Sequence, residues 1–412
     1  MPAVLELTIN FGANGNSLGY LGGGWARAEE HFTWAVGPES HLLLNLGQNA
    51  REYVLMLNVI PFVHPGSLPA QRLIVSMNET TIGVASVSRP SVLAWRIQAG
   101  AIRRAERTLI TLSHPDSARP SDLSKTPDDR ELAFSLSEAR LYHITPNGAA
   151  LPPGLGMGGA VGPGFAIQPG VDLKEWVTRR TGLSLAELAT KFESIGDNCE
   201  FGLVQRRCDT EPLGLLRFSG SFSHDVIRGI EHNFDGIGEP ADITPKLEGA
   251  GPKREFMIYE RKYGLVYHTF VHEGERAPEL LRQQEATRLR FLRRKFLEEL
   301  DAGEKIFVFK RVVPVPESEI LPLFLALNRN GPNTLLWVVP EEPGHPAGTV
   351  EILMDGLLKG YVDRFAPSDN AHDFSFEAWI RLCAHAFLLN GLARASGLPR
   401  VSTPAPPPQA SA

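Results

Sequence analysis

Short apolar runs, each seven to thirteen residues long and separated by turn residues, fill the first third of the chain. They are "VLELTINF", "HLLLNLG", "YVLMLNVIPFV", "QRLIVSMN", "SVLAWRI", "RTLITLSH" and "LAFSLSEARLYHI". Gly, Pro, Asn and Ser stand between the runs, and no long helical period appears among them. This spacing is typical of antiparallel strands, so residues 1–145 are predicted to form a jelly-roll-like β-sandwich.

The pattern changes after the last of these runs. Residues 146–171 are rich in Gly and Pro and nearly free of charge, so they predict a linker. A second domain is expected over 172–400. The final stretch, 401–412, reads "VSTPAPPPQASA" and predicts a disordered tail.

The second domain mixes helical and strand patterns. Ser184 with Glu187 three residues later forms a capping box at the start of a helix. The segment 277–303 has apolar residues at helical spacing and ends at Gly303. "EFMIYERKYGLVYHTFVH" predicts two strands around a turn, and further strands are expected at "KIFVFKRVV", "NTLLWVVP" and "TVEILMD" before a last helix at "FEAWIRLCAHAFLLNGLA". The domain is expected to be α+β or α/β, and the chain as a whole an α+β two-domain protein.

Composition narrows the function classes. The 412 residues are 43% hydrophobic and carry a net charge of −6, which gives no electrostatic reason to expect nucleic acid as a partner. No stretch approaches the roughly 20 apolar residues of a membrane span. The first residues lack the features of a secretory signal, so a cytoplasmic protein is expected. Three cysteines without metal-ligand spacing predict neither a disulfide framework nor a metal site, and no cofactor is expected.

Cys199 is the strongest candidate for chemistry. It follows the turn residues Gly196, Asp197 and Asn198 and precedes a predicted helix, "EFGLVQRR". A thiol at a helix start is expected to have a lowered pKa, and nearby backbone amides, with Asn198 as a side-chain donor, could hold an oxyanion. The alternative is that Cys199, like Cys208 and Cys383, is a small buried thiol without chemistry.

A thiol nucleophile needs a base. His268 is the best placed of the histidines because it interrupts an apolar, aromatic strand, "YGLVYHTF". The alternative is a histidine satisfied within the core. Asp355 and Asp363 are candidates for an acid that orients the imidazole, and the sequence does not separate them.

These blocks carry a resemblance. "FESIGDNCEFGLVQRR", "YGLVYHTF", "RLRFLRRKF" and "KIFVFKR", in this order over about 190–315 with weaker support to 365, resemble a bacterial family of unknown function described as papain-like cysteine peptidases. The resemblance implies a papain-like α+β domain in which Cys199 is the nucleophile and His268 the base. Unlike papain-like enzymes, the chain has no Gln shortly before the cysteine, and Glu200 follows it. An acidic neighbour is expected to raise the thiol pKa.

The first domain has its own resemblance. "GGGWARAEEHFTWAVGPESHLLLNL" and "PDDRELAFSLSEARL" are similar to β-sandwich modules attached to bacterial glycosyltransferases and surface-polysaccharide proteins. That implies glycan contacts by Trp25, Trp34, Asp129 and Arg130, although both tryptophans could equally belong to the sandwich core.

Two hypotheses follow from these observations. In the first, the protein is a thiol-dependent hydrolase or acyl transferase acting on a glycan or polysaccharide precursor, with glycosyltransferases as partners. In the second, it is a non-catalytic carbohydrate-binding or scaffold protein of polysaccharide biosynthesis.

Overall fold

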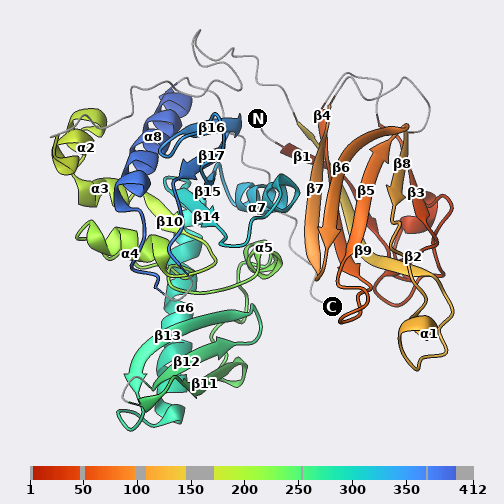
Figure 1. Ribbon diagram of the computed structural model, residues 1–412, viewed down its shortest axis with the longest axis horizontal. Helices are drawn as coiled ribbons and strands as arrows, with labels where there is room; N and C mark the ends of the chain where they lie inside the picture. The colour runs from red at the N-terminus through yellow and green to blue at the C-terminus, as the bar shows by residue number, and fades with distance from the viewer. Residues whose placement is uncertain are drawn as a thin grey trace, which may run out of the picture. The chain divides into compact units, whose positions relative to one another are not determined.

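The computed structural model describes residues 3–46, 52–98, 108–144, 171–251, 254–367 and 370–395 (Figure 1). The chain divides into two compact units: Met1–Pro146 with Val315–Pro322, and Asn147–Pro314 with Leu323–Ala412. The predicted tail and all but the last residue of the predicted linker lie outside the described residues.

The first unit contains two antiparallel sheets. In one, β1, β9, β4 and β7 lie in that order and β2 pairs with β9; in the other the order is β3, β8, β5, β6. The first sheet comprises β1 (Ala3–Asn10), β2 (Thr33–Val36), β4 (Glu52–Pro61), β7 (Ser91–Ile97) and β9 (Leu132–Ile144). The second comprises β3 (Glu39–Leu44), β5 (Gln71–Met77), β6 (Thr80–Val87) and β8 (Thr108–Ser113). Two short helical turns, η1 (Ser17–Gly19) and α1 (Pro120–Leu123), lie between strands.

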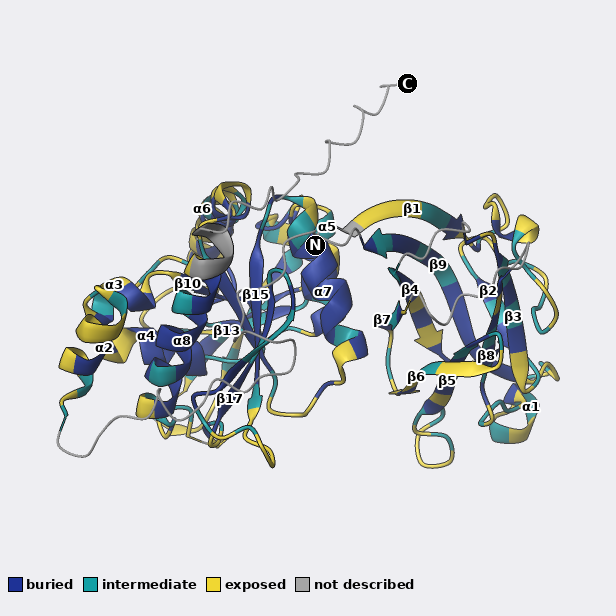
Figure 2. Cartoon of the chain, turned by 90° about the horizontal axis from the view of Figure 1, so that it is seen from above, coloured by how far each residue is buried: buried dark blue, intermediate teal, exposed yellow. Residues whose placement is uncertain are grey.

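Apolar side chains from both sheets form one core. Along β5 buried residues alternate with more exposed ones, as expected when one face of a sheet packs and the other meets water (Figure 2). Residues such as Phe11, Leu57, Val75 and Phe134 are almost completely buried in this core. The predicted antiparallel β-sandwich is therefore confirmed. Strands β2 and β6 were not predicted.

The second unit is built on a mostly parallel sheet. Its order is β10, β14, β15, β17, β16, with parallel pairing throughout except between β16 and β17. The strands are β10 (Phe192–Ser194), β14 (Ile306–Lys310), β15 (Thr334–Pro340), β16 (Val350–Met354) and β17 (Leu357–Val362). A separate antiparallel sheet contains β11 (Ile243–Glu248), β12 (Glu255–Glu260) and β13 (Leu265–His272). Of the two classes left open by the sequence, this central sheet is of the α/β type. The papain-like fold is not confirmed.

Helices occupy most of the remaining chain. They are α2 (Leu173–Thr181), α3 (Leu185–Ala189), α4 (Glu200–Arg207), α5 (Ser223–Glu231), the short η4 (Pro240–Asp242), α6 (Pro278–Ala302), α7 (Glu317–Arg329) and α8 (Phe376–Ala395). The predicted capping box is present on α3, and α6 ends at Gly303, whose φ of 60° is the left-handed conformation that glycine adopts easily. None of the helices in the described part of the chain is long and apolar enough to cross a membrane.

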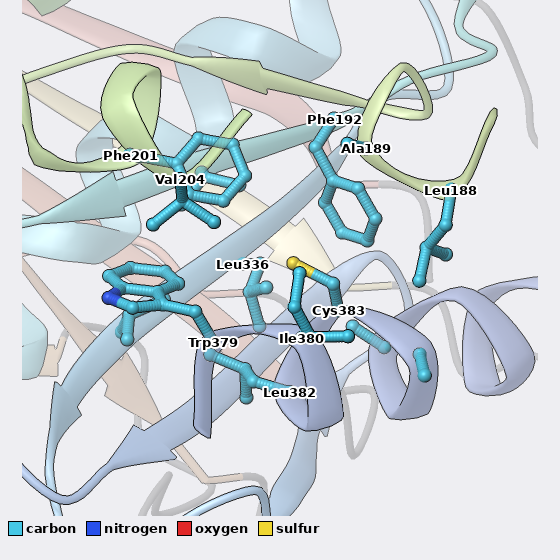
Figure 3. Close-up of a cluster of buried hydrophobic side chains, with 14 of the residues drawn as sticks. Leu188, Ala189, Phe192, Phe201, Val204, Leu336, Trp379, Ile380, Leu382 and Cys383 are labelled. Carbon is cyan, nitrogen blue, oxygen red and sulfur yellow. The ribbon is translucent and has the colours of Figure 1, made fainter. Parts of the chain in front are cut away.

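Two of the three cysteines lie in the core between helices and the central sheet. Cys383 on α8 packs among Phe192, Val204 and Leu336 (Figure 3). Cys208 at the end of α4 is equally buried. Burial raises the pKa of Cys208 to about 12 and that of Cys383 well above its usual value. The prediction that both are buried thiols is confirmed.

Candidate functional site

A cavity of about 440 Å³ lies within the second unit, and the predicted nucleophile Cys199 and the predicted base His268 line it. Its walls come from α4, the loop after α4, the strands β12 and β13, the helix α6 and the segment before α8. The lining residues that matter chemically are Cys199, Arg206, Glu255, His268, Phe270 and Arg288.

A strained turn positions Cys199. Asp197 adopts a φ of 71°, which is unusual for a residue with a side chain, and its carboxylate accepts a hydrogen bond from the Val312 amide at 2.8 Å. Asn198 uses its side-chain oxygen to accept from the Glu200 amide at 3.0 Å. Cys199 then occupies the N-cap of α4 without a side-chain cap bond. The predicted helix start at the cysteine is confirmed.

The Asn198 contact alters the expected oxyanion site. One of the backbone amides at this helix start, that of Glu200, is already bound to the Asn198 oxygen. The side-chain oxygen of Asn198 acts as an acceptor here, and Asn198 is not among the residues that line the cavity.

The surroundings of Cys199 oppose ionisation of its thiol. It donates a hydrogen bond to the Phe218 carbonyl, with the sulfur 3.7 Å from the oxygen. Burial raises the pKa of Cys199, and the positive charges of Arg206 and Lys310 oppose this only in part. The expectation of a lowered pKa at this helix start is corrected, because the loss of solvation outweighs the effect of the nearby cations.

Glu200 does not act on the thiol as the sequence suggested. Its side chain is fully buried and points into the domain core, where its oxygens accept from the Lys310 ammonium at 2.7 Å, the Trp379 indole at 2.9 Å and the Ala366 amide at 3.2 Å. Burial, and not the Glu200 carboxylate, raises the pKa of Cys199. Glu200 anchors the start of α4 instead.

His268 is held by a carboxylate that the sequence did not single out. Its Nδ1 lies 2.7 Å from Glu255 Oε1, and the imidazole is about half exposed. This contact fixes the ring and leaves Nε2 as the atom able to take or give a proton. Cys199 and His268 line the same cavity. In the described part of the chain the thiol donates its hydrogen bond to the Phe218 carbonyl and not to the imidazole.

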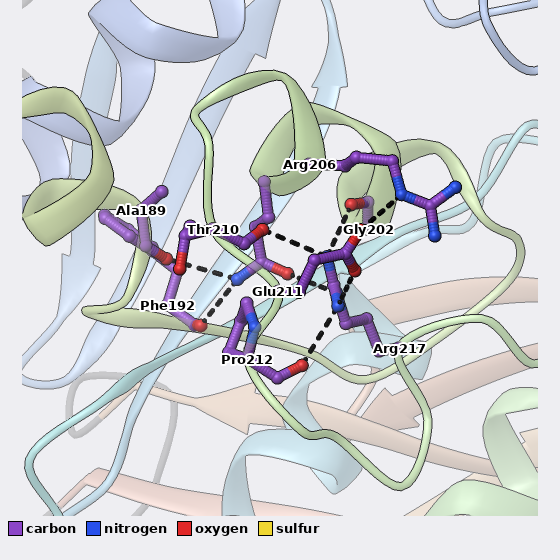
Figure 4. Close-up of polar contacts among 9 residues, drawn as sticks. Ala189, Phe192, Gly202, Arg206, Thr210, Glu211, Pro212 and Arg217 are labelled. Carbon is purple, nitrogen blue, oxygen red and sulfur yellow. Dashed lines mark hydrogen bonds and ion pairs between the residues drawn. The ribbon is translucent and has the colours of Figure 1, made fainter.

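A buried arginine holds the cavity wall that follows α4. Arg217 donates to Gln205 at 2.9 Å, to Glu211 at 2.7 Å and to the carbonyls of Gly202 and Pro212 at 2.9 and 3.0 Å (Figure 4). Gln205 in turn donates to the carbonyls of Ala189, at the end of α3, and Phe192, in β10. Since Phe218 follows Arg217 directly, this network fixes the carbonyl that receives the Cys199 thiol.

The two candidate orienting acids lie elsewhere. Asp355 is in the turn between β16 and β17, so it stands where the parallel strand β17 begins, whereas Cys199 follows the end of β10. Because these strands run parallel, the start of β17 and the end of β10 lie at opposite ends of the sheet's strands. Asp363 follows β17 and is exposed, and it does not line the cavity. The structure places Glu255, and neither aspartate, beside His268.

The predicted glycan contacts of the sandwich separate into two groups. Trp25 packs against Phe11 and the core, and its indole donates to the His41 carbonyl at 2.9 Å. Trp34 instead lies half-buried on the outer side of β2, because Thr33 and Ala35 on either side of it are the buried positions. Asp129 and Arg130 are exposed.

Trp34 belongs to a cluster of three aromatic side chains, here named the aromatic face: Phe32, Trp34 and Phe62. The Trp34 ring meets Phe32 edge to face at 5.8 Å and Phe62 at 6.4 Å between centroids. Across the sheet, Trp34 pairs with Ser135, which also pairs with the partly exposed Ile60. Neither Phe32 nor Phe62 was predicted. Phe32 could have been found, because it lies two residues before Trp34 and alternate residues of an extended chain share a face. Phe62 could not, because the pairing of distant strands brings it to Trp34.

Within the described residues, no group of His, Cys, Asp and Glu is arranged to hold a metal ion.

Comparison with known proteins gives no family assignment. The sequence matches no family model and no curated protein, so these comparisons do not support the resemblance to papain-like peptidases. Among solved structures, one match is a family GH115 4-O-methyl-α-glucuronidase with specificity for decorated arabinogalactans, at 8% identity and a TM-score of 0.24, covering 35% of this chain and 18% of that one.

Two further matches are carbohydrate-binding modules. The C-terminal CBM6 of a laminarinase from Zobellia galactanivorans has 11% identity and a TM-score of 0.21, covering 33% of this chain and 97% of that one. A family 35 carbohydrate-binding module from an environmental isolate has 18% identity and a TM-score of 0.18, and the match covers 37% of this chain and 95% of that one. All these TM-scores are below 0.5, so no function is carried over from these proteins.

Proposed function

We propose that the protein binds a glycan through the aromatic face of its sandwich. The observation that carries the proposal is the half-buried Trp34 flanked by Phe32 and Phe62 on the outer side of the sheet. Ring faces of this kind pack against the apolar C–H face of a sugar. The carbohydrate-binding modules named above are consistent with this proposal, which rests on the residues of this chain.

Polar side chains that could bind sugar hydroxyls are connected to the turn that carries Phe32. Arg130 forms ion pairs with Asp128 at 2.7 Å and with Glu29 at 3.3 Å. The Glu29 amide donates to the Phe32 carbonyl at 2.8 Å, so the turn that carries Phe32 also carries one of these carboxylates. A few polar groups beside an apolar platform are the usual means of fixing the orientation of a bound sugar.

Affinity electrophoresis of the full chain tests this function. The gels contain a soluble β-1,3-glucan, a xylan or an arabinogalactan, and at least one polysaccharide is expected to retard the wild type. Trp34→Ala is expected to weaken binding by about tenfold or more, since the central aromatic residue is removed. Leu18→Ala is the control, because Leu18 is an exposed apolar residue of the same unit, 84% accessible, outside the aromatic face. Equal mobility of all proteins in every gel would contradict the proposal.

A second candidate function is thiol-dependent acyl transfer or hydrolysis in the cavity of the second unit. It is favoured by one observation: Cys199 and a His268 held by Glu255 line the same cavity. In this proposal His268 takes the thiol proton at Nε2, and the sulfur attacks an ester or amide carbonyl to form a thioester. The proton passes from His268 to the leaving group, and water or an acceptor hydroxyl then releases the acyl group.

The pH dependence of Cys199 alkylation by iodoacetamide tests this second function. If His268 accepts the thiol proton, the wild-type rate contains a component that follows the ionisation of a histidine and is absent in His268→Gln. Cys199→Ser identifies the labelled peptide. Superimposable pH profiles for the wild type and His268→Gln would show that the two residues do not act together.

A further inference from the structure

Phe270 stands out at the cavity because its backbone and its side chain are both unusual. Its φ is 57°, a conformation that bulky residues rarely adopt, and its side chain is 71% exposed although it is large and apolar. It also lines the cavity that contains Cys199. Strained residues that persist in a fold are found mainly where function requires them.

A bulge in β13 produces this conformation. Met257 pairs with His268 and Glu255 with His272, so three residues of β13 lie opposite Phe256 alone. Such bulges turn a side chain away from its regular direction in the strand. Here the turned side chain is Phe270.

Side-chain hydrogen bonds hold the bulge in place. Glu255 uses one carboxylate oxygen for His268 at 2.7 Å and the other for the Phe270 amide at 2.9 Å. Thr269 donates to the Phe256 carbonyl at 2.6 Å and accepts from the Val271 amide at 3.1 Å. The positions of the imidazole and of the phenyl ring are therefore set by one carboxylate.

The two rings stack. The centroids of His268 and Phe270 lie 5.8 Å apart with an angle of 20° between their planes. One exposed ring lying nearly parallel to another at a cavity offers a flat apolar surface beside a group that can form hydrogen bonds. Nothing in the packing of β13 requires a phenylalanine there, since its side chain is mostly exposed.

We propose that Phe270 is a ligand-binding platform that stacks on a ring with an apolar face, either an aryl group or a pyranose, and directs it toward Cys199. This proposal requires neither glycan binding by the sandwich nor catalysis by the thiol. The rate at which Cys199 is alkylated reports whether a reagent stacks on Phe270.

The experiment compares three alkylating reagents at Cys199 of the full chain: iodoacetamide, N-phenyl iodoacetamide and N-iodoacetyl glucosylamine. Rates are measured by peptide mass spectrometry and divided by the rates with glutathione. The wild type is expected to favour the phenyl or the glucosyl reagent over iodoacetamide by roughly three- to tenfold, and the favoured reagent identifies the kind of ring. Phe270→Ala is expected to abolish the preference. Phe291→Ala, which removes a partly exposed phenylalanine of α6 outside the cavity, is expected to retain it.

Phe270→Gly separates binding from folding. Glycine adopts a positive φ without strain, so this variant is expected to melt at the wild-type temperature or above it while losing the reagent preference. A clearly lower melting temperature would assign Phe270 a structural role and overturn the proposal. Equal normalised rates of the three reagents in the wild type would also overturn the proposal. So would a preference for the phenyl or the glucosyl reagent that persists in Phe270→Ala.

Discussion

The Lys310 ammonium lies 2.7 Å from the Glu200 carboxylate, and both side chains are almost completely excluded from solvent. Removal of one partner leaves the other charge buried. We therefore expect Glu200→Ala to lower the free energy of unfolding by about 3–5 kcal/mol. Urea denaturation measures this change.

An exposed ion pair of the same unit is the control. Arg254 and Glu273 are about half exposed and lie 3.0 Å apart. Arg254→Ala is expected to cost less than about 1 kcal/mol, because solvent screens this pair. A similar small loss in Glu200→Ala would show that the buried pair does not anchor α4.

Glu193 on β10 should make stability depend on pH. Burial raises its pKa from 4.5 to about 8, and Lys305, 3.4 Å away, offsets this only in part. Between these values the folded state binds more protons than the unfolded state. The contribution of this group is therefore fully present below pH 4.5 and is lost as the pH rises through about 8.

Glu193→Gln tests this dependence. In the wild type this group alone lowers the free energy of unfolding by at most about 1.4 kcal/mol per pH unit in that window. The variant should lack this slope, because glutamine does not titrate. Denaturant midpoints at a series of pH values measure it, and parallel curves for the two proteins would contradict the assignment.

The three cysteines should differ in accessibility. Cys208 and Cys383 are 1% and 2% exposed, whereas Cys199 lines the cavity. Iodoacetamide is expected to modify Cys199 slowly at neutral pH, because its pKa is raised, and to reach the other two only in denaturant. Labelling of Cys383 at the rate of Cys199 in the native protein would be incompatible with this core.

Gly83 on β6 should tolerate no side chain. A Cβ at this position would lie 1.8 Å from Trp95 in the sandwich core. Gly83→Ala is expected to destabilise the protein by about 1–3 kcal/mol through overpacking. Gly19→Ala is the matched control, because a Cβ there meets no atom within 4 Å. Thermal unfolding of the two variants distinguishes them, and equal melting temperatures would contradict this packing.

Strands with regular alternation and helices with clear caps were predictable from the sequence. Two of the strands that were not predicted, β6 and β17, contain a glycine at a position where the packing leaves no room for a side chain. In β17, Gly360 lies where a Cβ would come within 2.4 Å of Leu382, so an apparent turn residue is required inside a strand. In β6, Gly83 has the same relation to Trp95.

The site was predictable in part. Cys199 at a helix start and His268 in a strand were found from local patterns, and the hairpin of β12 and β13 was predicted as well. Extending its register from the turn places Glu255 opposite Phe270 and within two residues of the partner of His268. Glu255 could thus have been a candidate for the orienting acid. The bulge that brings the Glu255 carboxylate to His268 could not be predicted from the sequence, because it depends on side-chain hydrogen bonds.

The pairing of the Glu200 carboxylate with buried donors could not be predicted from the sequence, for a different reason. Its partners Lys310 and Trp379 lie 110 and 179 residues later in the chain. A local rule about acidic neighbours therefore gave the wrong cause for the thiol pKa.

The long sequence distance between Glu200 and its partners also affects how the domain folds during synthesis. During synthesis the N-terminal part emerges first, so the start of α4 is complete only after β14 and then α8 have left the ribosome. Closing such long loops is slow compared with forming local helices. Until then Glu200 and the Cys199 thiol face water, and the nascent chain is at its most open to oxidation at this cysteine.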